Sequence, residues 1–163
     1  MVSQPKIDYT NRLIDESLLE GDDTIELKGK FIGDEGVEAL LLSNKLEYIE
    51  DLDLSNNSIT WRGAVKLFKS DKFKNLKRLY INDNNIGDKG ALALAEAPFL
   101  GGLSVLDLRF NNIEASGGMA IASCERFSKL QVLSFQENNV GDQTLITIAK
   151  NPSFGNIRKL NFY

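Results

Sequence analysis

The chain of 163 residues contains no histidine and only one cysteine. Without histidine it lacks the commonest general base and metal ligand of proteins. One cysteine excludes an internal disulfide and favours a reducing compartment, so we expect a cytoplasmic protein. The N-terminal stretch has no apolar run typical of a secretory signal, and no window approaches the roughly 18 apolar residues of a membrane span. A protein delivered to a host cytoplasm without such a signal would look the same.

Charge is modest in total but unevenly distributed along the chain. The net charge of −4 argues against a general nucleic-acid binder. Residues 1–55 carry 14 acidic and 5 basic side chains, a net charge of −9, whereas residues 56–163 carry 9 acidic and 14 basic side chains, a net charge of +5. This asymmetry either steers charged partners or only serves solubility at one end of the fold.

What the sequence does contain is a repeat of 27 residues with the pattern LxxLxLxxNxIxxxG. Four near-complete copies begin at Ile49, Leu76, Leu103 and Leu130. A weaker copy precedes them, with Lys30 in the asparagine position, and a half copy begins at Ile157. In the fourth copy Thr144 replaces the glycine. Each unit first alternates apolar and polar residues and then takes helical spacing, which predicts a strand followed by a helix.

The recurring asparagines stand where each strand should turn toward its helix. They are Asn57, Asn84, Asn111 and Asn138. Stacked side by side, their amides can bond turn N–H and C=O groups of neighbouring units, which suits a ladder of buried hydrogen bonds. A buried bond left unmade costs about 1–3 kcal/mol. We therefore interpret these asparagines as structural rather than catalytic.

Further recurring positions mark the predicted helix starts and the core. Asp34, Asp88 and Asp142 precede the helical stretches, and we expect each carboxylate to cap its own helix. Glycines at 36, 63, 90 and 117 predict a close approach between helix start and turn. The apolar residues that close the units are expected in the core, namely Leu46, Phe73, Leu100, Phe127 and Phe154. The single cysteine, Cys124, takes a position that holds small residues in other units and is expected to pack rather than react.

Neither half of a unit can bury its apolar side alone, so stacked units must share a continuous core. The predicted fold class is α/β, a right-handed β-α solenoid with parallel strands on its concave face and helices on its convex face. Residues 1–21, including Leu13 and Leu19, are expected to form an N-terminal capping helix. Residues 22–163 form the repeat domain, with units at 22–48, 49–75, 76–102, 103–129 and 130–156 and a half unit at 157–163.

This motif and spacing resemble the leucine-rich repeats of the ribonuclease-inhibitor subclass. That subclass includes ribonuclease inhibitor, the Ran GTPase-activating protein and the sensor regions of nucleotide-binding innate receptors. The resemblance implies a non-enzymatic module that binds a protein partner on its concave face. It also implies the solenoid fold over nearly the whole chain, from about residue 22 to residue 163.

The repeat register indicates which side chains face outward from the strands and could meet a partner. Aromatic residues and arginine are typical interface anchors. The predicted partner-binding residues are Asp53, Tyr80, Asn82, Asp107, Arg109, Phe110 and Gln136. The alternative is a solvated sheet surface with ladder pairs such as Asp51 with Arg78, each contributing little.

Other functions remain open at this level. One is activation of a small GTPase, by likeness to the Ran activator, and another is a bacterial effector that mimics host leucine-rich repeat proteins. A C-terminal edge strand leaves self-association open. Glu26, Asp51 and Asp53 could converge on a cation, and the basic run 66–78 could touch phosphates or lipid. We favour a solvated surface for both, and we expect no catalytic residues, cofactor, metal, nucleic acid or membrane.

Overall fold

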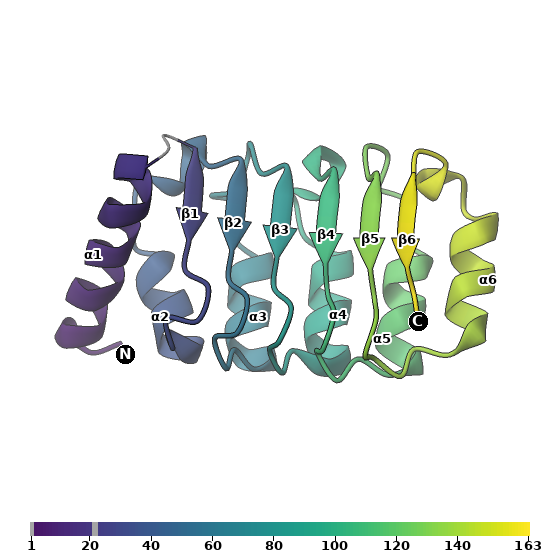
Figure 1. The fold of residues 1–163 in the computed structure, drawn as a ribbon, viewed down its shortest axis with the longest axis horizontal. Coiled ribbons are helices and arrows are strands. Elements are labelled where there is room, and N and C mark those ends of the chain that lie inside the picture. Colours follow the sequence, from purple (N-terminus) through teal and green to yellow (C-terminus); the bar gives the residue numbers. More distant parts are fainter. Residues whose placement is uncertain (1, 21–22) are drawn as a thin grey trace.

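The computed structural model describes residues 2–20 and 23–163, and its strands lie side by side in chain order with helices behind them (Figure 1). The strands are β1 (Thr24–Glu26), β2 (Asp51–Asp53), β3 (Arg78–Tyr80), β4 (Val105–Asp107), β5 (Val132–Ser134) and β6 (Lys159–Asn161). The α-helices are α1 (Gln4–Glu20), α2 (Gly33–Leu40), α3 (Trp61–Phe68), α4 (Gly87–Ala95), α5 (Ala115–Ala122) and α6 (Asp142–Lys150). Short 3₁₀ helices precede three of the strands, namely η1 (Leu46–Tyr48), η2 (Leu100–Gly102) and η3 (Pro152–Phe154). The predicted α/β solenoid is confirmed.

Neighbouring strands are parallel and pair in the register of the repeat. Leu52 lies beside Leu79, and Leu79 lies beside Leu106, each 27 residues apart. Because side chains alternate along a strand, the middle residue of each strand points toward the helices while its neighbours point away from them. Ile25, Leu52, Leu79, Leu106 and Leu133 are accordingly fully buried. The register predicted from the spacing is therefore confirmed.

The core runs continuously between the sheet and the helices. The residues that close the units are buried in it, namely Leu46, Phe73, Leu100, Phe127 and Phe154. Aromatic rings join adjacent repeats there, with 5.9 Å between the ring centroids of Phe73 and Phe99 and 5.4 Å between those of Phe127 and Phe154. Each helix packs on the helices of the adjacent repeats. Stability in such an array comes mainly from contacts between neighbouring repeats.

Helix α1 packs against β1 at the edge of the sheet, and its own residues Leu13 and Ile14 are buried in the core. The Ser17 hydroxyl donates to the carbonyl of Glu26 at 3.1 Å and accepts from its N–H at 3.2 Å. Ser17 thus stands in for a paired strand at that point of the edge. The predicted boundary at residues 21–22 and the side chain of Leu19 lie outside the described residues. Among the helices that are described, none combines the length and apolar character needed to cross a membrane.

The repeated asparagines bond the turn of the preceding repeat. Asn84 Nδ2 donates to the carbonyl of Leu54, 30 residues earlier, at 2.9 Å. Its Oδ1 accepts from the N–H groups of Asn57 at 3.1 Å and Ile59 at 2.9 Å. Asn57, Asn111 and Asn138 make the same kind of bond to carbonyls 30 residues earlier. Each asparagine bonds the repeat before it, so the carbonyl of Leu27 in the first unit is already satisfied by Asn57 of the second. The first unit has no earlier repeat to bond, and it therefore tolerates Lys30 in the asparagine position.

The expectation that each aspartate caps its own helix is wrong. Helix α2 begins at Gly33, so Asp34 lies inside its first turn, and α2 has no side-chain cap. The Asp34 carboxylate instead accepts from the N–H groups of Thr60 at 2.8 Å and Gly63 at 3.1 Å. It also accepts from the Thr60 hydroxyl at 2.6 Å. Asp34 therefore caps α3, the helix of the next repeat.

Asp88 repeats this arrangement two repeats later. Its carboxylate accepts from the N–H of Glu114 at 2.7 Å and from the Ser116 hydroxyl, at the start of α5. Helices α4 and α6, like α2, begin without a side-chain cap, so Asp88 and Asp142 do not cap their own helices either. The first and third repeats thus provide a capping aspartate, and the second and fourth repeats receive it. This period of two repeats is not visible in the 27-residue motif.

We expect Asp34→Ala to lower the free energy of unfolding by about 0.5–2 kcal/mol, the usual cost of losing a helix cap. The loss follows because the N–H groups of Gly63 in α3 and of its N-cap residue Thr60 lose their acceptor. Asp142→Ala is the control: Asp142 also lies in the first turn of its helix, but its carboxylate meets only the exposed Tyr163 hydroxyl. Urea unfolding of both variants measures the difference, and equal losses would contradict a cap that crosses repeats.

Candidate functional site

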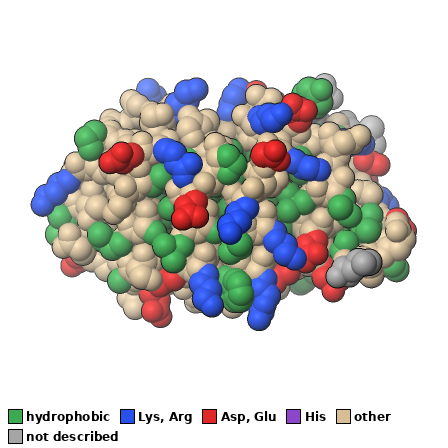
Figure 2. Space-filling model, turned by 180° about the vertical axis from the view of Figure 1, so that it is seen from behind, with side chains coloured by type: hydrophobic (Ala, Val, Ile, Leu, Met, Phe, Trp, Pro, Cys, Tyr) green, Lys and Arg blue, Asp and Glu red, His purple; other side chains and the backbone are tan. Residues whose placement is uncertain are grey.

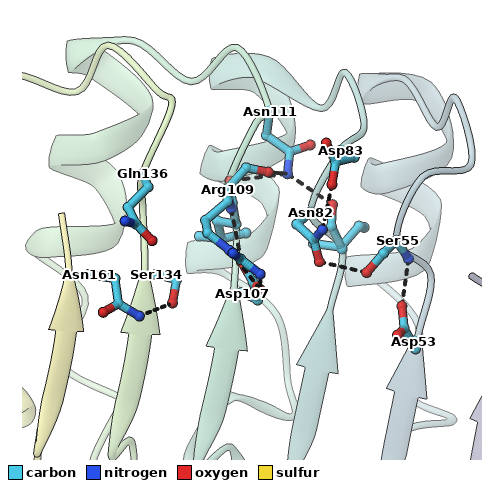
Figure 3. Close-up of polar contacts among 12 residues, drawn as sticks. Asp53, Ser55, Asn82, Asp83, Asp107, Arg109, Asn111, Ser134, Gln136 and Asn161 are labelled. Carbon is cyan, nitrogen blue, oxygen red and sulfur yellow. Dashed lines mark hydrogen bonds and ion pairs between the residues drawn. The ribbon is translucent and has the colours of Figure 1, made fainter. Parts of the chain in front are cut away.

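The outward-pointing side chains of the strands and of the turns that follow them form a continuous surface, here called the sheet face. The seven predicted partner-binding residues lie on strands β2, β3 and β4 or in the turns after β3, β4 and β5. Figure 3 shows Asp53, Asn82, Asp107, Arg109 and Gln136 on neighbouring repeats of this face. The fixed register between strands is what brings residues so distant in sequence onto one surface.

The centre of the sheet face holds an ion pair within one repeat. Asp107 is only 6% exposed, and Arg109 Nε lies 2.9 and 3.0 Å from its two carboxylate oxygens. Arg109 Nη2 lies 2.6 Å from Asp107 Oδ2 (Figure 3). The hydrogen bond to this carboxylate raises the pKa of Arg109 above its ordinary value. The guanidinium thus balances a buried charge, which would be costly to leave unpaired.

A chain of polar contacts links the second and third repeats. Asp53 Oδ1 accepts from the N–H of Ser55 at 2.8 Å, and the Ser55 hydroxyl donates to Asn82 Oδ1 at 2.6 Å (Figure 3). Asn82 Nδ2 then donates to Asp83 Oδ2 at 2.6 Å. The repeat register places Ser55 and Asp83 at outward positions, but neither was among the seven predicted partner-binding residues. These groups are held by one another, so the surface is organised before any partner arrives.

The same holds at the C-terminal end of the sheet face. Gln136 Nε2 donates to the carbonyl of Tyr163 at 2.8 Å, and Asn161 Nδ2 donates to the Ser134 hydroxyl at 2.9 Å. The Tyr163 hydroxyl donates to Asp142, and this bond raises the pKa of the exposed tyrosine. Gln136 therefore orders the last residues of the chain instead of projecting freely.

Tyr80 lies half-buried beside the charged pair on β2 and β3. Burial is the main cause that raises the pKa of Tyr80, and the nearby Asp51 carboxylate adds to it. Asp51 itself pairs with Arg78 of the next strand, the ladder pair expected from the register. Asp51 is paired with Arg78 and Asp53 is bonded to Ser55, so these carboxylates already have partners and the suggested cation site with Glu26 gains no support. In the described part of the chain, no group of three carboxylate or cysteine side chains is placed to hold a metal ion.

Phe110 is the most exposed of the seven predicted residues, and its backbone has an unfavourable conformation. Its side chain is 46% exposed, and its φ is +52°, in the left-handed region. The equivalent residues of other repeats share this conformation, namely Gly29, Asn56, Asp83 and Glu137. Glycine, asparagine and aspartate adopt it readily, whereas a bulky residue there is strained. The sequence identified Phe110 as an outward aromatic but gave no sign of the strain.

The basic run 66–78 neutralises the acidic repeat before it. Its pairs join Lys66 to Glu38, Lys74 to Glu47, Lys77 to Glu50 and Arg78 to Asp51, all 27 or 28 residues apart. Lys72 Nζ donates to the carbonyls of Leu41 at 2.6 Å and Ser43 at 2.9 Å, near the end of α2. The charge asymmetry therefore serves contacts between repeats, and the suggested phosphate or lipid role of this run is disfavoured.

The helical side of the molecule offers a weaker candidate surface. Figure 2 shows Lys and Arg side chains intermixed with Asp and Glu there, with hydrophobic side chains scattered between them. Two exposed apolar residues, Leu92 on α4 and Ile146 on α6, lie two repeats apart. Scattered apolar residues of this kind are ordinary on protein surfaces. The sheet face is accordingly the better candidate.

Comparisons with known proteins agree with this architecture. A family model described as Leucine Rich repeat matches residues 45–68, 74–95 and 103–122. The comparison with curated proteins found no match. Among solved structures, the tropomodulin C-terminal domain of Caenorhabditis elegans is similar, with a TM-score of 0.62, 14% identity, and coverage of 93% of this chain and 92% of that chain. Such low identity shows a shared fold alone. The chain therefore contains leucine-rich repeats in these three segments and folds as an α/β solenoid.

Proposed function

We propose that this protein is a non-enzymatic, cytoplasmic module that binds a protein partner on its sheet face, with repeats of the ribonuclease-inhibitor subclass. Leucine-rich repeats generally mediate protein–protein interaction, and the sheet face is the concave face in curved arrays of this type. The 27-residue period and the asparagine position support the subclass. The absence of histidine from the sequence and the open, mutually bonded polar face give catalysis little support.

Phe110 carries the proposal. Its ring is exposed on a strained backbone, so the fold would be more stable with a smaller residue at this turn. It follows Arg109 directly in the chain, and half-buried Tyr80 lies on the adjacent strand β3. Buried aromatic and arginine side chains dominate the energetics of protein interfaces. A polar surface that is already ordered loses little freedom when a partner binds, which favours affinity.

Phe110→Asn is the sharpest test, because Asn56 occupies the equivalent position with a φ of +54°. We expect this variant to raise the free energy of unfolding by about 0.5–1 kcal/mol through relief of backbone strain. We expect it also to weaken partner binding by about tenfold or more, as for an aromatic anchor. The measurements are urea unfolding, then affinity capture from a lysate of the source cell with quantitative mass spectrometry.

The control is Leu92→Asn, which removes an exposed apolar side chain from the helical side. It should capture the same proteins as the wild type. Capture by Phe110→Asn in wild-type amounts would remove Phe110 from the proposal. Arg109 is a poorer test site, because its removal leaves the buried Asp107 carboxylate unpaired. Weaker capture by such a variant could then result from lost stability as well as from a lost contact with the partner.

The remaining alternatives stay predictions from the sequence. A GTP-hydrolysis assay over a panel of small GTPases separates a GTPase regulator from a simple binding module, since binding alone leaves turnover unchanged. A bacterial effector would be distinguished by the origin of the captured partner. Self-association through β6 would appear as a concentration-dependent increase in mass on size-exclusion chromatography.

A further inference from the structure

A polar hollow of about 370 Å³ lies outside the sheet face, where strands β4, β5 and β6 begin. This is the upper edge of the solenoid in Figure 1. Its lining includes the basic residues Lys77, Lys129 and Arg158, and among the described residues no acidic side chain lines it. The hollow exists because small residues, Gly102 and Ser104, stand where the preceding repeat has Asn75 and Lys77.

Two of its basic side chains lack the counter-charge that the fold provides elsewhere. In the second and third repeats, Lys74 and Lys77 pair with glutamates 27 residues earlier. At the same offset, Lys129 has Gly102 and Arg158 has Gln131, neither of which carries charge. Within the described residues, no carboxylate forms an ion pair with Lys129 or Arg158. The pairing of bases with acids between repeats thus stops at this hollow.

The hydrogen-bonding groups around the hollow favour an anion. Two of its backbone acceptors are occupied, and the first is the carbonyl of Gln131, which accepts from the N–H groups of Arg158 at 2.8 Å and Lys159 at 3.0 Å. The carbonyl of Ser128 accepts from Asn156 Nδ2 at 2.7 Å. The Lys129 ammonium and the Arg158 guanidinium remain as donors. Arginine binds phosphate groups through two parallel hydrogen bonds, and lysine adds a point charge.

We propose that this hollow binds a phosphate-bearing small ligand with at least two negative charges. Lys129 and Arg158 are the principal donors, and Lys77, which also lines the hollow, contributes charge while it remains paired with Glu50. The site is independent of the proposed protein-binding face, because none of the seven sheet-face residues lines it. It differs from the basic run 66–78, where Lys66, Lys72, Lys74 and Arg78 are bonded within the fold.

The test is isothermal titration calorimetry of the full chain with pyrophosphate at low ionic strength. We expect Lys129→Gln with Arg158→Gln to weaken binding about tenfold or more, since each lost charge-assisted bond is among the stronger kind. Lys69→Gln with Lys150→Gln is the control, because it removes the same net charge from exposed positions outside the hollow. This control should keep wild-type affinity within about twofold, as expected when only distant, screened charges are lost.

Two results would overturn the proposal. One is no binding of pyrophosphate by the wild type, whether or not anionic-lipid vesicles bind, and the other is equal weakening in the two double variants. A preference for pyrophosphate over citrate, an anion of similar charge near neutral pH, would support it, because a merely electrostatic surface would not distinguish them by shape. Circular dichroism and urea unfolding verify that both double variants are folded.

Discussion

Replacing Asn84 by alanine is expected to lower the free energy of unfolding by about 2–5 kcal/mol. Its Oδ1 is the acceptor for the N–H groups of Asn57 and Ile59, both buried in the turn of the preceding repeat. Its Nδ2 also serves the carbonyl of Leu54. Alanine removes the side-chain amide without admitting water, so two N–H donors and the carbonyls of Leu54, Ile81 and Asn82 lose this partner in a largely buried place. Each buried donor left unpaired costs about 1–3 kcal/mol.

The matched control is the next residue, Asn85→Ala. The Asn85 side chain is exposed, and its one side-chain contact is with Asn112 Nδ2 at 2.8 Å on the surface. We expect a change within about 0.5 kcal/mol there, as for ordinary surface substitutions. Urea or thermal unfolding of the two variants measures the contrast. A similar small loss for both would show that the asparagine ladder contributes little to stability.

Gly117→Ala is expected to destabilise the protein by about 1–3 kcal/mol through overpacking. Gly117 lies within α5, where alanine would be preferred over glycine by helix propensity alone. A Cβ at this position would lie 2.5 Å from Asp88 Oδ1, 2.8 Å from Ile113 Cγ2 and 2.9 Å from Ala91 Cβ. The alanine methyl cannot rotate away, and movement of Asp88 would break the cap that it provides to α5.

Gly101→Ala provides the control for this substitution. The nearest atom to a Cβ at Gly101 would be the carbonyl oxygen of Arg126, at an ordinary 3.9 Å. We expect this variant to be neutral or more stable by about 0.4–1 kcal/mol, because alanine restricts the unfolded chain. Differential scanning calorimetry of both variants suffices. A stabilised Gly117→Ala protein would mean that the close approach of the two repeats is not required.

These effects share a physical origin, since the polar contacts with the greatest structural consequence join adjacent repeats. Asp34 joins the first repeat to the second, and Asn84 and Lys77 join the third repeat to Leu54 and Glu50 of the second. A repeat of this size cannot bury its apolar side alone. The buried polar groups are therefore satisfied by a neighbour, and loss of one such contact weakens an interface rather than a single helix.

The candidate site was only partly predictable from sequence. The spacing predicted that Tyr80, Arg109 and Phe110 would belong to outward positions of adjacent strands and turns. It did not reveal that Arg109 is already engaged by the buried Asp107, or that Gln136 holds the end of the chain. Those facts depend on rotamers and on which neighbour comes within hydrogen-bond distance. The role of these residues in binding a partner stays a prediction.

The 27-residue periodicity alone was enough to determine the strand and helix order, the register and the buried apolar set, because identical spacing forces equivalent residues into the same place in every unit. Only the tertiary structure decided where the polar groups find their partners. Asp34 and Asp88 cap the next helix instead of their own, because helix starts one repeat apart approach closely where Gly63 and Gly117 lack side chains. Likewise, the hollow with Lys129 and Arg158 arises from small residues one repeat away. Periodicity determines burial, whereas distance and direction in space determine hydrogen bonds and charge pairing.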